Sequence, residues 1–261
     1  MNEQLKAFSG VVKYEFLMQI RRPVLWIAYL CLSLLFVRLG RGGPFYTLIF
    51  NPYNQSIMAL SAEWTRNLMF VFPIVYGVLL ADRLARDRRR KVEEILLTLP
   101  SATTTRMLGK YVGSSLAALL PLFLYDCAGI GFLLFSSHNL MALPDGLLKF
   151  AVVALPGLLF VSAFSIACPS IMWVPLYQVL FTGYWFWGNI LGPSSLIPSL
   201  STTILTPVGG YMASGFFGDN LQLIEHATAV QGMESILLLL GITALVMYSL
   251  CKVVAWQQER Q

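Results

Sequence analysis

One long stretch of the sequence contains no charged residue, and it limits the possible folds more than any other feature. From Phe150 to Gly218 there is no Asp, Glu, Lys or Arg. Soluble domains carry roughly a quarter charged residues, whereas this chain carries 12%, against 57% hydrophobic residues. A run of this length and composition needs lipid around it rather than water. The sequence therefore predicts an all-α integral membrane protein.

Apolar segments of membrane-spanning length recur along the chain. They predict a single transmembrane domain over residues 1–261 with six spanning helices, at about 23–39, 64–80, 111–135, 147–167, 171–191 and 235–254. One helix over 147–191 would measure roughly 68 Å, about twice the thickness of the hydrocarbon core. The tripeptide Cys168-Pro169-Ser170 is therefore expected to form a tight turn between the fourth and fifth spans.

The distribution of Lys and Arg predicts the orientation of these spans. Of the 18 Lys and Arg residues, fourteen fall in segments that this topology puts inside and four in segments that it puts outside. Cytoplasmic segments carry the excess of Lys and Arg in membrane proteins. We therefore expect a multi-pass protein of the cell (plasma) membrane, with both termini and residues 81–110 in the cytoplasm.

Residues 81–110 form the only long charged segment of the chain. Four apolar residues within it share one face of a helix, at Val92, Ile95, Leu96 and Leu99. Pro100 ends this helix, because proline disfavours helical geometry in the residue before it. Such a segment is either a positively charged membrane anchor or a docking element for a cytoplasmic partner. Leu97 and the adjacent Glu93 and Glu94 are more than an anchor needs, and they favour docking.

The string ADRLARDRRRKVEEILLTLP, followed by a Thr-rich turn and LGKYVGS, resembles the permease subunits of type-2 ABC exporters. In that family an acidic and basic helix with a Glu-x-Leu-Leu…Pro core precedes a Gly-Lys pair that opens the third span. The positions that carry the resemblance are Asp82, Asp87, Glu94, Leu96, Pro100, Gly109 and Lys110. The motif covers about residues 81–115, and the layout of six spans with both termini inside extends the comparison to the whole chain.

The resemblance implies a permease subunit of an ATP-driven exporter, working as a dimer with a second permease copy or a homologous permease and with two copies of an ABC ATPase subunit. The charged segment would be the cytoplasmic coupling helix. The residues expected to dock on the ATPase are Arg88, Arg89, Arg90, Lys91, Glu93, Glu94, Leu97 and Pro100. The chain has no phosphate-binding GxxxxGK[ST] loop, so we expect ATP and Mg²⁺ to bind to the partner. No catalytic residue, cofactor or metal site is expected in this chain.

Two further segments match expected parts of such a permease. Residues 2–22 carry apolar side chains on one helical face and predict an interfacial elbow helix on the inner leaflet. Residues 192–233 are apolar but broken by several Pro and Gly residues. Irregular backbone at membrane depth is tolerated only inside protein or along a wet cavity. We therefore expect short outer re-entrant helices in this region.

Four residues of the spans are candidates for a role in transport, although for Asp126 a structural hydrogen bond to a neighbouring span is the favoured alternative. Asp126 is the only acid well inside an apolar stretch, and its side chain is expected to face protein or a water-filled cavity. Tyr177, Phe181 and Tyr184 are candidates for a pathway suited to an amphipathic, lipidic, peptide or drug-like substrate. An interfacial aromatic belt is an alternative for the last of these.

Other classes of function remain as alternatives. The chain could be a non-transporting membrane scaffold or assembly factor, with lipid as its main surroundings. An intramembrane protease built on Glu93 and Glu94 would need histidines at membrane depth, whereas His138 and His226 both fall in predicted outer loops. Nucleic-acid binding is not expected, because most of the net charge of +5 belongs to the charged segment. The four cysteines show no metal-binding spacing.

Overall fold

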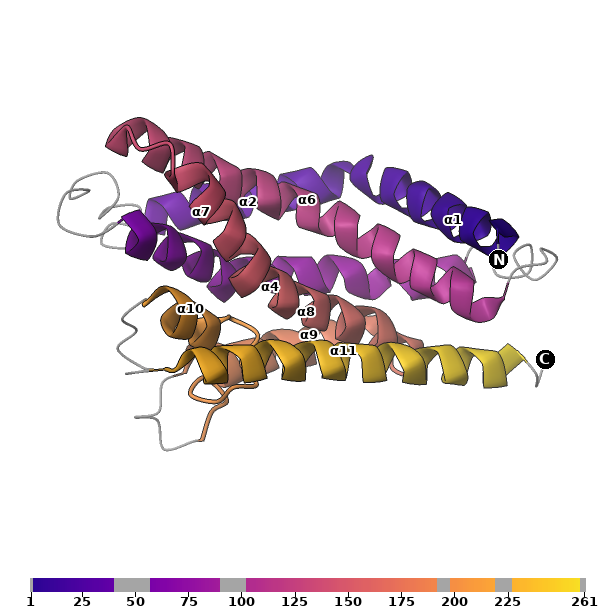
Figure 1. Ribbon diagram of the computed structural model, residues 1–261. Helices are drawn as coiled ribbons and strands as arrows, with labels where there is room; N and C mark the ends of the chain where they lie inside the picture. Colours follow the sequence, from indigo (N-terminus) through magenta and orange to yellow (C-terminus); the bar gives the residue numbers. More distant parts are fainter. Residues whose placement is uncertain (1, 40–56, 90–101, 192–197, 219–226, 259–261) are drawn as a thin grey trace.

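The computed structural model describes residues 2–39, 57–89, 102–191, 198–218 and 227–258. Within these ranges the protein is all-helical and contains no strand (Figure 1). The first half comprises α1 (Asn2–Ile20), α2 (Pro23–Leu39), α4 (Ile57–Arg89) and α6 (Thr103–Ser137). The second half comprises α7 (Ala142–Lys149), η1 (Phe150–Ala154), α8 (Leu155–Ala167), η2 (Cys168–Ser170), α9 (Val174–Trp185), η3 (Phe186–Ile190), α10 (Gly210–Phe217) and α11 (Ala229–Gln258).

Four helical segments are long and apolar enough to cross a membrane. They are Leu60–Leu84, Thr103–Ser137, Ala142–Ser170 and Ala229–Trp256. Each exceeds the roughly 20 residues that a hydrocarbon core requires. A shorter apolar helix covers Pro23–Leu35. The prediction of an all-helical protein is therefore confirmed, with four described helices long and apolar enough to cross a membrane, while the number of six spans stays a prediction.

The long helices run lengthwise through one bundle (Figure 1). α4 lies at its centre and contacts α6, α8 and α9, and α11 packs against α8 and α10. The start of α1, the last turn of α4, the first turn of α6 and the end of α11 all lie at the same end of the bundle, which we call the inner end (Figure 1). We call the opposite end, where α6 meets α7, the outer end.

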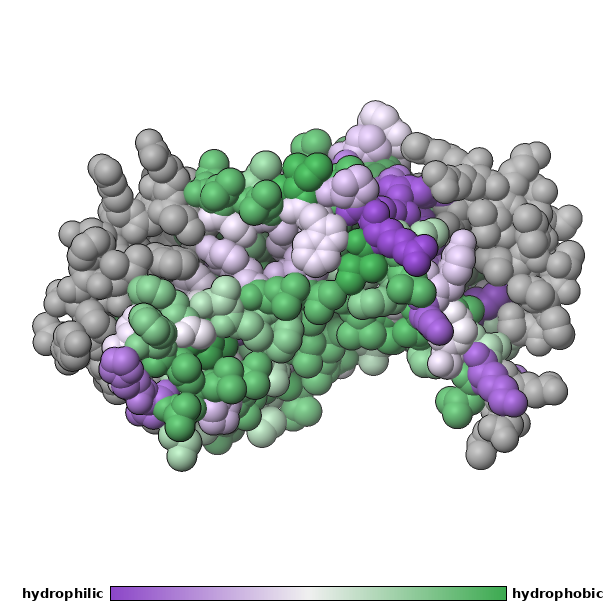
Figure 2. Space-filling model, turned by 90° about the horizontal axis from the view of Figure 1, so that it is seen from above, coloured by the Kyte–Doolittle hydropathy of each residue, from purple (hydrophilic) through white to green (hydrophobic). Residues whose placement is uncertain are grey.

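The surface of the bundle is apolar around its middle. On the face drawn in Figure 2, hydrophobic residues cover the central part and hydrophilic residues gather towards the ends. Large apolar side chains are exposed on several helices, among them Leu30 and Leu34 of α2, Val179 of α9, and Leu237 and Leu245 of α11. A soluble monomer rarely exposes so much contiguous apolar surface. Lipid is the environment that suits this surface.

The structure places α1 against α6, and its position relative to a membrane stays a prediction. Residues 2–22 are expected to lie flat on a leaflet, but α1 runs lengthwise beside the first half of α6 (Figure 1). Of the apolar residues along one face of this helix, Leu5 is exposed and Phe8, Val12 and Phe16 are half-buried, whereas Glu15 and Gln19 are buried. A polar contact with α4 and close packing on α6 bury the Glu15 side of α1 as well.

The helices of the second half begin and end close to the predicted places. The helix expected from residue 147 already begins at Ala142 and continues through the π-helical turn η1. It ends in the 3-10 turn η2 at Cys168–Ser170, where a turn is predicted. Pro175 then lies in the first turn of α9, which tolerates proline because its N–H groups need no helical partner.

The described part of the predicted re-entrant region folds against the bundle. Residues 198–209 are irregular, and α10 follows. Thr206 and Val208 are buried, and Thr206 Oγ1 donates a hydrogen bond to Asn189 Oδ1 at 2.9 Å. This segment is therefore part of the packed protein at the outer end, not an exposed loop. Its position relative to a membrane stays a prediction.

Candidate functional site

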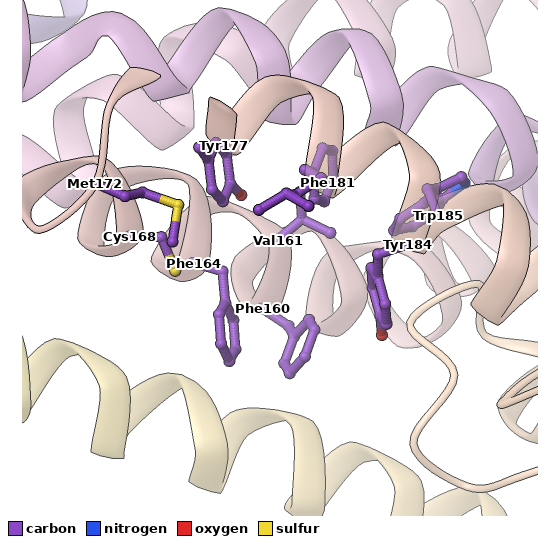
Figure 3. A pocket seen from close by; sticks show the side chains of 10 residues that line it. Phe160, Val161, Phe164, Cys168, Met172, Tyr177, Phe181, Tyr184 and Trp185 are labelled. Carbon is purple, nitrogen blue, oxygen red and sulfur yellow. The ribbon is translucent and has the colours of Figure 1, made fainter. Parts of the chain in front are cut away.

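A pocket of about 380 Å³ lies between α8 and α9, and all three predicted pathway residues line it. Tyr177, Phe181 and Tyr184 contribute from α9, and Phe160 and Phe164 contribute from α8 (Figure 3). The α9 residues are spaced by four and three positions, so one helical face brings them together. Nearly the whole wall is aromatic or aliphatic, so the pocket suits an apolar group rather than an ion.

The wall of this pocket is held by a few specific contacts. Tyr177 stacks on Phe181 with ring centroids 5.7 Å apart, and the Tyr177 hydroxyl lies 2.9 Å from Ser165 Oγ. Trp185 Nε1 donates to the main-chain oxygen of Phe70 at 2.7 Å, which fixes α9 against α4. Phe160 and Phe164 point towards α11 in Figure 3. These contacts hold the pocket wall in place on the side of the bundle where α8, α9 and α11 lie.

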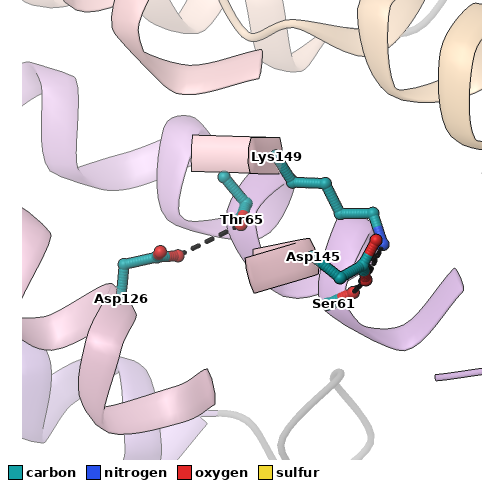
Figure 4. Close-up of polar contacts among 5 residues, drawn as sticks. All are labelled: Ser61, Thr65, Asp126, Asp145 and Lys149. Atoms are coloured by element: carbon teal, nitrogen blue, oxygen red, sulfur yellow. Dashed lines mark hydrogen bonds and ion pairs between the residues drawn. The ribbon is translucent and has the colours of Figure 1, made fainter. Parts of the chain in front are cut away.

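Asp126 lies inside the bundle, between α6 and α4 (Figure 4). Its carboxylate is fully buried, and Thr65 Oγ1 donates to its Oδ1 at 3.1 Å. Trp64 Nε1 donates to the main-chain oxygen of the same residue at 3.3 Å. The Oδ2 atom has no hydrogen-bond partner among the described residues. The side chain therefore faces protein, one of the two surroundings expected from the sequence. A single hydrogen bond compensates poorly for burying a charged carboxylate, so this environment suits a neutral carboxyl group better.

A second buried polar cluster lies one helical turn of α4 from Thr65 (Figure 4). Lys149, at the end of α7, is fully buried and forms an ion pair with Asp145. Ser61 Oγ donates to Asp145 Oδ2 at 2.8 Å, and Lys149 Nζ donates to Ser61 Oγ at 2.7 Å. Lys149 Nζ also lies 5.2 Å from the centroid of the Phe217 ring. The cluster ties α4, α7 and α10 together at the outer end.

At the inner end, a buried ion pair joins α1 to α4. Arg83 Nε donates to Glu15 Oε2 at 2.7 Å, and the two side chains are only 2% and 4% exposed. α6 approaches the same region through Gly113, where an added Cβ would lie 2.6 Å from the main-chain oxygen of Val12. α1 therefore contacts both helices that flank the charged segment.

The positions that carry the family resemblance divide into described and undescribed ones. Asp82 pairs with Arg86 on α4, and Gly109 and Lys110 lie in the second turn of α6, where Lys110 is buried. Arg88 and Arg89 belong to the last turn of α4. The remaining predicted docking positions, Arg90, Lys91, Glu93, Glu94, Leu97 and Pro100, lie outside the described residues.

Sequence reasoning missed two of these clusters. Asp145 and Lys149 stand four residues apart, a spacing that indicates an ion pair on one helix, and this signal was available. Glu15 and Arg83 are 68 positions apart, and no local pattern relates them. Only the packing of α1 against α4 and α6 makes these two a pair.

Among the described residues, no three His, Cys, Asp or Glu side chains lie close enough together to hold a metal ion. Comparison with protein-family models gives no match, and comparison with curated proteins gives none either. The resemblance to type-2 exporter permeases therefore rests on the sequence motif, and it enters below as a proposal.

Proposed function

We propose that the chain is the membrane-spanning permease subunit of an ATP-driven ABC exporter. The observation that carries the proposal is the charged segment at residues 81–110, which joins two helices of membrane-spanning length at the inner end of the bundle. A segment of mixed charge with an apolar face and a terminal proline is suited to docking on a cytoplasmic partner. Because its sequence resembles that of type-2 permeases, we propose that this partner is an ATPase subunit.

The contacts at the inner end support a mechanical role for this segment. α4 leads into it and α6 leads out of it, and α1 holds both through the Glu15–Arg83 pair and the close approach at Gly113. A displacement of the segment by the ATPase would therefore move three helices together. Two states of comparable free energy, biased by nucleotide on the partner, are enough to switch such a bundle.

The apolar pocket supports an amphipathic or lipidic substrate class. Tyr177 and Tyr184 supply hydroxyl groups in an otherwise apolar wall, and a pocket of about 380 Å³ holds a small apolar group or part of an acyl chain. In this proposal the substrate passes between two permease copies, and the pocket lies beside that path.

The test is purification of the tagged full chain from its native membrane under mild detergent. The proposal predicts that an ATP-hydrolysing subunit is retained in equal amount and is lost when residues 88–100 are replaced by a Gly-Ser linker of equal length. Retention of only non-ATPase membrane proteins would favour the scaffold alternative. Hydrolytic activity of the chain alone on a peptide or lipid would favour the enzyme alternative.

A further inference from the structure

A second pocket, of about 360 Å³, lies at the break between α1 and α2, beside the inner end of α4. Its polar wall consists of Gln19, Arg22 and Arg86, and its apolar wall includes Pro23, Leu25 and Leu79. None of the residues that line it is acidic. The pocket is separate from the aromatic pocket between α8 and α9.

The polar wall presents donors that suit an anion. Gln19 is 5% exposed, and its Nε2 atom has no hydrogen-bond partner among the described residues. A buried amide donor without an acceptor is costly, so a ligand oxygen that accepts from Gln19 would be stabilised here. Arg86 uses Nε and Nη2 to bind Asp82, and a guanidinium carries five N–H donors in all. Planar arginine donors match phosphate oxygens well.

The pocket crosses the boundary between apolar and polar parts of the bundle. The apolar segment of α4 ends at Leu84, so Leu79 lies inside it and Arg86 lies beyond it. Trp26 Nε1 donates to the main-chain oxygen of Ile20 at 2.8 Å, across the α1–α2 break. Tryptophan is typical of the membrane–water interface. A ligand in this pocket would thus have its polar part at headgroup level and its apolar part against α2 and α4.

We infer that this pocket binds an anionic phospholipid, with the phosphate on Gln19, Arg22 and Arg86 and the start of an acyl chain over Pro23, Leu25 and Leu79. Basic pockets between helices on the cytoplasmic side are known to take acidic headgroups. The inference requires only a membrane around the bundle and does not depend on the proposed transport function. The lipid would fix the α1–α2 break against the inner end of α4.

The test uses the purified full chain in detergent micelles that contain either phosphatidylglycerol or phosphatidylcholine, with retained lipid counted by native mass spectrometry. We expect phosphatidylglycerol to be retained preferentially. The variant R22Q should weaken this binding by clearly more than fivefold. The matched control R21Q removes the same charge from an exposed neighbour outside the pocket, and it should weaken binding by roughly fivefold or less, the general effect of one basic residue near a membrane surface.

A second variant keeps the inference testable if R22Q does not fold. Gln19→Leu removes the buried amide without changing charge, and it should also reduce retention of phosphatidylglycerol. Equal retention of both lipids would show that the pocket binds acyl chains without recognising the headgroup. Equal losses of phosphatidylglycerol binding in R21Q and R22Q would show only a general attraction between basic residues and an anionic surface. Displacement of the lipid by excess inorganic phosphate alone would assign the site to a free anion. Each of these three results overturns the inference.

Discussion

At the scale of single residues, the contribution of an ion pair to stability depends on how deeply the pair is buried. The Glu15–Arg83 pair is almost completely buried, whereas the Asp82–Arg86 pair on the same helix is about one-third exposed. Removing one member of a buried pair leaves an uncompensated charge, which costs about 3–5 kcal/mol. An exposed pair contributes roughly 0.3–0.5 kcal/mol.

The first prediction follows from this contrast. Glu15→Gln should lower the thermal stability of the purified protein strongly, and Glu15→Gln combined with Arg83→Gln should recover part of the loss. Arg86→Gln, which breaks the exposed pair, is the matched control and should shift the melting temperature little. The measurement is thermal unfolding in detergent. Equal, small effects of Glu15→Gln and Arg86→Gln would contradict a structural role for the buried pair.

The second prediction compares the buried acid Asp126 with the half-buried acid Asp145. Asp126→Asn should leave stability unchanged or raise it, because the amide oxygen still accepts from Thr65 and no charged form remains. Asp145→Asn should instead destabilise the protein, because it removes the carboxylate that pairs with the fully buried Lys149. Thermal unfolding of the two variants side by side tests this. Strong destabilisation by Asp126→Asn would mean that its carboxylate has a charged partner.

Transport by the same variant separates structure from function at Asp126. Because Asp126→Asn is expected to fold, a loss of transport would assign the carboxyl group a role in the transport cycle. Unchanged transport would leave it as a hydrogen-bond acceptor between α4 and α6.

At the scale of elements, close helix packing at α6 should be sensitive to single methyl groups. An added Cβ at Gly113 would lie 2.6 Å from the Val12 oxygen and 2.7 Å from Glu15 Cβ, whereas nothing lies within 4 Å of one at Gly131. Overpacking typically costs about 1–3 kcal/mol. Gly113→Ala should therefore destabilise the protein and loosen α1, which accelerated proteolysis of residues 2–20 would report.

The matched control for this third prediction is Gly131→Ala in the same helix. It should be neutral or stabilise by up to about 1 kcal/mol, because alanine favours helix over glycine. If both substitutions behave alike, α1 does not rest on the glycine surface of α6.

The elements show clearly what the sequence could and could not predict. Helices in the apolar runs were predictable, because hydrophobic length determines them, and the turn at Cys168–Ser170 was predictable from its proline and from the excessive length of an unbroken helix. The burial of Glu15 on α1 was not predictable, because its partner Arg83 lies in another helix. The pocket residues on α9 were predictable from helical spacing, but their partners Phe160 and Phe164 on α8 were not. Tertiary contacts carry no local signal.

At the scale of the whole molecule, the helix ends next to the Lys- and Arg-rich segments lie at one end of the bundle (Figure 1). The described ends of α1 and α11 lie at the same end of the bundle as the helix ends that flank residues 90–101 (Figure 1). The fourth prediction is that this end is cytoplasmic. Single cysteines in a background without Cys31, Cys127, Cys168 and Cys251 should be unreactive towards an impermeant reagent in intact cells at Lys6 and Lys252, and reactive at Asn139. The reverse pattern would contradict the topology.

The proposed ATPase contact at residues 88–100 should be more sensitive to the loss of an apolar side chain than to the loss of a charge. Truncating a central apolar contact of an interface costs about 2 kcal/mol or more. Losing a charge at its rim costs less and mainly slows association. We therefore expect Leu97→Ala to weaken assembly with an ATPase more than Arg88→Ala does, and Glu94→Lys to uncouple ATP hydrolysis from transport.

The most direct measurement is the ATPase rate and retained ATPase subunit of the reconstituted complex in liposomes, for the wild-type chain and for the variant with Leu97→Ala and Glu94→Lys. The account predicts that the variant inserts normally, keeps less of the ATPase and no longer couples its hydrolysis to transport, while Arg88→Ala stays close to wild type. If the double variant assembles and transports like the wild-type chain, residues 81–110 are only a membrane anchor and the proposed coupling function is wrong.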